Sequence, residues 1–144
     1  MDSEKTLAQL RQFLLIISAG IFFMTVAELF FLEHWNFTIQ FLPFVLCVLG
    51  IVTAALAYFK PSKGIIRFTQ WSMIIIAVCS LIGFYMHMAG NYTFWQEVQP
   101  DSTLWELVVE TFKGGIPILA PGILTIGGVI GWAAIYNHPA LQVK

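Results

Sequence analysis

Two ionisable residues lie inside otherwise apolar stretches, and they are the residues of this sequence best suited to chemistry. Glu28 lies in TVAELFF and His87 lies in GFYMHMAGN. An acid at the centre of a membrane helix costs about 2.5 kcal/mol or more on insertion scales, so such groups usually serve a ligand, a proton or a partner. The structural alternatives are that Glu28 stays protonated and bonds a neighbouring helix, and that His87 bonds lipid headgroups or backbone.

Carboxylate and imidazole together predict a site for a divalent transition metal, with Zn, Fe, Mn and Ni as candidates. No H-E-x-x-H or E-x-x-H spacing occurs, so the ligands would come from different helices. Haem is less favoured, because a pair of axial histidines would need His87 with His34, and both lie at the margin of the apolar segments. The predicted metal-ligating residues are Glu28, His87, His34, Glu97, Glu106 and Glu110.

The composition indicates an integral membrane protein. Of the 144 residues, 58% are hydrophobic and only 10% are charged, against about 25% charged in a soluble domain. The net charge of −1 offers no basic field for nucleic acid. Cys47 and Cys79 stand alone within apolar runs, so no thiol redox or zinc-finger motif is present.

Four apolar runs are long enough to span a membrane, since a spanning helix needs about 20 residues. They cover approximately 13–32, 37–59, 65–88 and 116–136. The sequence therefore predicts an all-α, four-transmembrane-helix bundle that forms one membrane domain over 1–144. Short links, EHWN and KPSKG, make the first three spans antiparallel neighbours.

The distribution of basic residues predicts the orientation, because cytoplasmic loops are enriched in Lys and Arg. Six of the seven bases lie before the first span, in the second link or after the fourth span; the exception is Lys113. Both termini are therefore expected in the cytoplasm, and we expect the protein in a bacterial inner (plasma) membrane.

The third link and the fourth span carry further signals. Residues 103–112 combine a capping-box spacing, Thr103 with Glu106, and an apolar face, which predicts a short amphipathic helix on the outer membrane surface. Glu106 and Glu110 could equally be its solvated face. Prolines in the outer half of the fourth span predict an irregular helix, either lining a cavity or simply kinked.

Since these anomalies share the outer half, we expect one outward-facing pocket that binds a cation, with a transition metal among the candidates, or a small polar solute, for handling or transport. The alternative is an accessory or assembly subunit of a larger membrane complex, or a homo-oligomer, that docks through the G-x-x-x-G face of Gly127 and Gly131. An enzyme is disfavoured, because no nucleophile motif accompanies Glu28 and His87.

Overall fold

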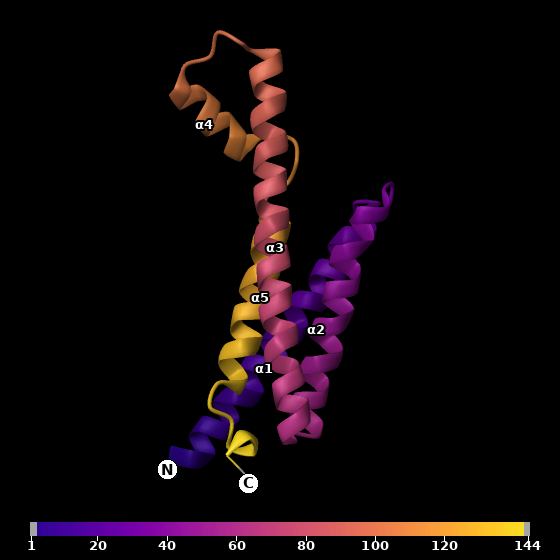
Figure 1. The fold of residues 1–144 in the computed structure, drawn as a ribbon, viewed down its shortest axis with the longest axis vertical. Coiled ribbons are helices and arrows are strands. Elements are labelled where there is room, and N and C mark those ends of the chain that lie inside the picture. Colours follow the sequence, from indigo (N-terminus) through magenta and orange to yellow (C-terminus); the bar gives the residue numbers. More distant parts are fainter. Residues whose placement is uncertain (1–2, 143–144) are drawn as a thin grey trace.

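The computed structural model describes residues 3–142, which form helices joined by turns, with no strand among them. Helix α1 is followed by a tight turn and the 3-10 helix η1, and η2 follows α5 (Figure 1). The elements are α1 Ser3–Phe31, η1 Thr38–Phe41, α2 Leu42–Phe59, α3 Lys63–Val98, α4 Leu104–Lys113, α5 Leu119–Ile135 and η2 Pro139–Leu141.

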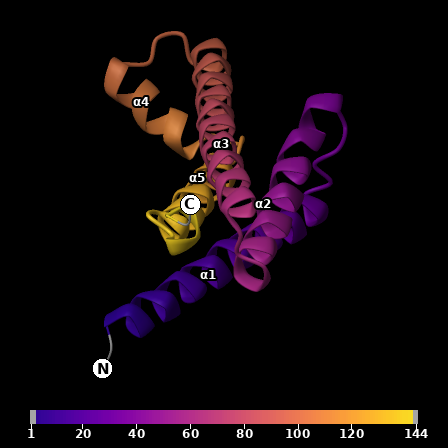
Figure 2. The ribbon, with the colours of Figure 1, turned by 60° about the horizontal axis from the view of Figure 1, so that its bottom comes forward.

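The four longer helices pack in the cyclic order α1, α2, α3, α5, so that α5 closes the bundle between α1 and α3. Helix α4 contacts α3 and lies apart from the other helices (Figures 1 and 2). Both termini lie at one end of the molecule, opposite α4 (Figure 1). We refer to these two ends as the termini end and the α4 end.

Small residues let the helices approach closely around one buried ring. Phe22 of α1 is completely buried and packs over Gly50 of α2 and Gly127 of α5, where a side chain would collide with the ring. On the other side of α5, a β-carbon on Gly128 would lie 2.9 Å from the backbone oxygen of Met73 on α3. A hydrogen bond from Ser18 Oγ to the Gly127 carbonyl, 2.8 Å, joins α1 to α5.

The G-x-x-x-G face is used inside the chain, and the prediction that it docks a partner is wrong in this respect. Gly127 packs against Ile21 and Phe22, and Gly131 packs against Met73 and Ser18. Both glycines are buried. The motif does allow close helix packing, but the helices that pack against it are α1 and α3 of the same chain. The existence of a partner complex stays a prediction.

Helix α3 is longer than the predicted third span, 65–88. It runs without interruption to Val98, 36 residues in all, which corresponds to about 54 Å at 1.5 Å per residue. The additional helical residues 89–98 contain no proline, and Asn91 is held by hydrogen bonds to the chain that follows α4. Polar composition therefore marked the end of the apolar run but not the end of the helix.

The amphipathic helix predicted at 103–112 is confirmed as α4, one residue further along. The Thr103 hydroxyl accepts from the Glu106 N–H, and the Glu106 carboxylate accepts from the Thr103 N–H at 2.9 Å, which is a complete capping box. Leu107 and Thr111 are its buried residues. The larger apolar side chains remain exposed: Leu104, Trp105, Val108 and Phe112.

Three helical segments are long and apolar enough to cross a membrane: 3–31, 38–59 and 63–98. Helix α5, within the predicted fourth span, is equally apolar but has only 17 residues, because the chain around Pro117 is not helical and the helix begins at Leu119. Many large apolar side chains are exposed on these helices, as expected of surfaces that meet lipid rather than water.

Candidate ligand-binding groove

An open groove of about 650 Å³ runs along one face of α1 towards the α4 end. One stripe of α1 and the residue that follows it supply most of the wall, and α5 contributes a single residue. The lining residues are Gly20, Ile21, Met24, Thr25, Ala27, Glu28, Phe31, Leu32 and Ile123. The groove is therefore apolar except for one hydroxyl and one carboxylate.

The packing of the opposite face of α1 determines which residues line this groove. Phe22 and Ser18 are buried against α5, and this fixes the rotation of α1 about its axis. Gly20, by contrast, has open space where a side chain would be. The Thr25 hydroxyl donates to the Ile21 carbonyl of its own helix, 2.9 Å, so its hydrogen is already used.

Glu28 is the one ionisable group of the groove. Its side chain is exposed, and no residue among 3–142 forms a hydrogen bond or ion pair with its carboxylate. A carboxylate at the edge of an apolar membrane segment requires water, a proton or a positive partner. The geometry therefore leaves Glu28 available to a positively charged group that enters the groove.

His87 lies on α3 and is bound to the chain that precedes α5. Its Nδ1 is 2.7 Å from the Pro117 carbonyl oxygen. Pro121, four residues further on, has no N–H that could bond this carbonyl in a helical pattern. Since a carbonyl only accepts, Nδ1 must carry the proton, and the neutral ring then has its lone pair on Nε2. His87 is thus an oriented imidazole with one nitrogen, Nε2, able to bind a metal ion.

His34 lies in the turn after α1, two residues beyond the last residue of the groove wall. Its N–H donates to the Leu29 carbonyl, 3.0 Å. Burial lowers the pKa of His34 below its usual value, and the positive charge that His87 can carry lowers it further. Two imidazoles 53 positions apart in the sequence are therefore close enough for a charge on His87 to act on His34.

The remaining predicted ligands, Glu97, Glu106 and Glu110, lie in or near α4. Glu106 and Glu110 already bond neighbouring residues. Glu106 is engaged by Thr103, and Glu110 forms an ion pair with Lys113 at 3.2 Å. Glu97 is exposed near the end of α3. Over residues 3–142, no three His, Cys, Asp or Glu side chains lie close enough together to hold a metal ion. The six-residue metal shell stays a prediction.

Asn91 has a role that its position in the sequence did not reveal. It lies four residues beyond His87 on α3, and its amide is buried and bonds only backbone. Nδ2 donates to the Thr111 carbonyl, 3.1 Å, and to the Ile116 carbonyl, 2.9 Å, while Oδ1 accepts from the Ile116 N–H, 2.9 Å. Asn91 thereby fastens the end of α4 and the link to α5 onto α3.

Comparison with protein-family models, with curated proteins and with solved structures finds no match to this chain.

Proposed function

We propose that the chain is a four-span integral protein of a bacterial inner membrane, with α5 as its fourth span and the termini end in the cytoplasm. Two observations support this topology. The termini and the link between α2 and α3 lie at the same end, and that end carries nearly all the basic residues. The α4 end carries most of the acids.

We propose further that the groove beside Glu28 binds a cationic ligand from the outer side of the membrane, for handling or transport. The observation that carries this proposal is the unpartnered carboxylate on the wall of a groove of about 650 Å³. The rest of the lining is almost wholly apolar, which favours an organic cation with an apolar body, since that body replaces water along the wall while Glu28 meets the charge.

A divalent transition metal is the second ligand considered, and the proximity of His34 and His87 favours it. His87 offers Nε2, and the lowered pKa of His34 favours its neutral ring, which is the form that binds a metal. Such an ion would need at least one further ligand, and over residues 3–142 no third His, Cys, Asp or Glu side chain lies close enough to complete the site.

Titration calorimetry of the protein in lipid nanodiscs separates these ligands. Tetrabutylammonium is the organic probe and Zn²⁺ the metal probe. We expect Glu28→Gln to weaken tetrabutylammonium binding at least tenfold and Glu97→Gln, which removes an equal charge outside the groove, to leave it unchanged. His34→Ala and His87→Ala should affect only Zn²⁺. If the wild type binds neither probe, or if E28Q binds tetrabutylammonium as tightly as the wild type, the groove is not a cation site.

An accessory subunit of a membrane complex is the other candidate function. It is favoured by the open space at Gly20 and by the fact that one helix supplies nearly the whole groove wall, so that a partner helix could lie along α1. A basic residue on that helix would then pair with Glu28. Native mass measurement after gentle extraction tests this: a stoichiometric partner lost in E28Q supports it, and an isolated chain or homo-oligomer that binds the probes excludes it.

A further inference from the structure

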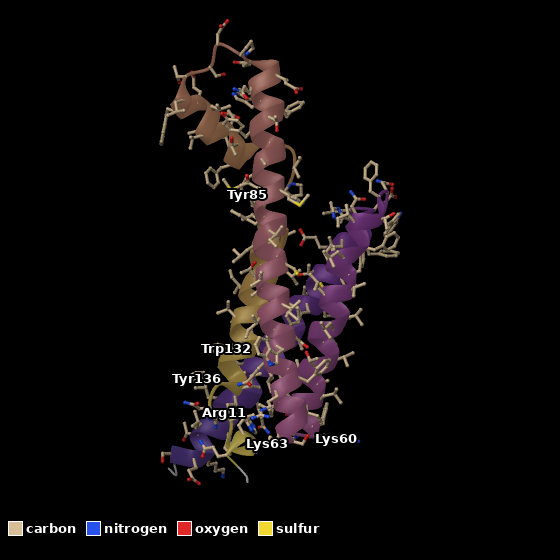
Figure 3. The ribbon with its side chains drawn as sticks, in the orientation of Figure 1. Arg11, Lys60, Lys63, Tyr85, Trp132 and Tyr136 are labelled. Atoms are coloured by element: carbon tan, nitrogen blue, oxygen red, sulfur yellow. The ribbon has the colours of Figure 1, made fainter. Side chains whose placement is uncertain are left out.

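The termini end carries a group of basic side chains that the proposed ligand groove does not use. Figure 3 shows Arg11, Lys60 and Lys63 together at this end, with Trp132 and Tyr136 one level further into the bundle. Arg11 lies in α1, Lys60 is the C-cap of α2, and Lys63 is the first residue of α3. Glu4 is the acid that the described part of α1 brings to the same end.

Helix α3 places two basic residues in line with an aromatic side chain. Lys63, Arg67 and Trp71 follow each other at intervals of four residues, which places them on one stripe of the helix. All three are exposed, and Trp71 is 66% exposed. Lys60 precedes this stripe in the link from α2 and is exposed as well. We call these four residues the α3 basic stripe.

The chain itself does not neutralise the stripe at Lys60 or Arg67. The side chain of neither residue forms an ion pair with any residue in 3–142. The neighbouring side chains are large and apolar: Phe59 is 76% exposed and Phe68 is 54% exposed. Two basic groups therefore stand at the edge of a surface that is suited to hydrocarbon.

We infer that the α3 basic stripe binds the headgroup of an anionic phospholipid. The phosphate would meet Lys60 and Arg67, and the Arg67 guanidinium can donate two parallel hydrogen bonds to it. Trp71 would lie at the level of the headgroup–acyl boundary, where its indole is favoured, and the acyl chains would lie along the exposed apolar residues of α2 and α3. A free anion would gain nothing from the apolar surface, whereas a phospholipid would meet both the basic side chains and that surface. This inference does not depend on the Glu28 groove.

Lipid retention measured by native mass spectrometry, with phosphatidylglycerol and phosphatidylcholine as the probes, tests the inference. Each base near an anionic surface contributes about fivefold in affinity. We expect the wild type to prefer phosphatidylglycerol, Arg67→Gln to weaken its binding about fivefold and Lys60→Gln/Arg67→Gln about 25-fold. Lys5→Gln removes a charge at the same end but off the stripe, and should change binding much less. Trp71→Leu should weaken both lipids.

Two results would overturn the inference. Equal losses in K5Q and R67Q would mean that the preference reflects only the overall charge of this end. Displacement of bound phosphatidylglycerol by millimolar inorganic phosphate would mean that the bases form a simple anion site without a lipid component. Since E28Q leaves this end unchanged, failure of the groove experiment and failure of this one are distinguishable.

Discussion

Replacing Asn91 with leucine is expected to release the link between α4 and α5 from α3 while the rest of the bundle stays folded. Leucine has a similar size but can neither donate nor accept a hydrogen bond. The substitution removes three hydrogen bonds from a side chain that is only 3% exposed. The carbonyls of Thr111 and Ile116 and the N–H of Ile116 lose these partners.

The number of hydrogen bonds sets the free energy that the link is expected to lose. A hydrogen bond between neutral groups contributes about 0.5–1.5 kcal/mol net, so three contribute about 2–4 kcal/mol to the closed state of this link. Opening should therefore become about 30- to 1000-fold more frequent. The main bundle contacts, such as Phe22 over Gly50 and Gly127, lie elsewhere and should keep their protection.

Amide hydrogen exchange in nanodiscs measures this opening directly, because the Ile116 N–H is itself bonded to Asn91. We expect exchange at Ile116 and through α4 to accelerate by the factor above in N91L. Asn36 provides a matched control: it also precedes an aromatic residue and a threonine, but it is exposed, so Asn36→Leu should leave α4 unchanged. Unaltered exchange at Ile116 in N91L would refute the assignment of Asn91 as the group that holds this link.

Three further predictions rest on single contacts. Gly128→Ala should destabilise the protein, because the new β-carbon would lie 2.9 Å from the backbone of Met73. Gly20→Ala places its β-carbon in open space and should be neutral or stabilising by up to about 1 kcal/mol. Thermal unfolding of the two variants in the same detergent compares them. His87→Ala should raise the pKa of His34 towards its usual value, as followed by NMR titration of labelled histidine, and an unchanged pKa would show that the two rings do not interact. The Thr103 backbone N–H and hydroxyl lower the pKa of Glu106, so its stabilisation of α4 is present above the pKa of an unfolded glutamate and is lost as pH falls through the lower folded value. The helical content of α4 should decrease over that range, and Thr103→Ala, which removes the hydroxyl but keeps the backbone N–H, should reduce this acid dependence.

The sequence by itself determined the helical class, the apolar segments and the amphipathic helix α4. These features depend on local physics: an apolar segment must satisfy its backbone groups internally, and a capping box forms between residues three apart. The same locality explains the confirmed tight turn after α1 and the short link before α3. It also explains why Glu28 and His87 could be selected as unusual residues without knowledge of their neighbours.

Only the tertiary structure decided what these residues contact. The Ser18 hydroxyl donates to the Gly127 carbonyl, 109 positions away. This hydrogen bond and the packing of Phe22 fix which face of α1 lines the groove. His87 meets the Pro117 carbonyl, and Asn91 meets the link after α4, across 30 and 25 positions respectively. A sequence pattern predicts that a buried polar group needs a partner. Which backbone group becomes that partner depends on how the helices are packed, and this is a property of the whole chain rather than of any segment.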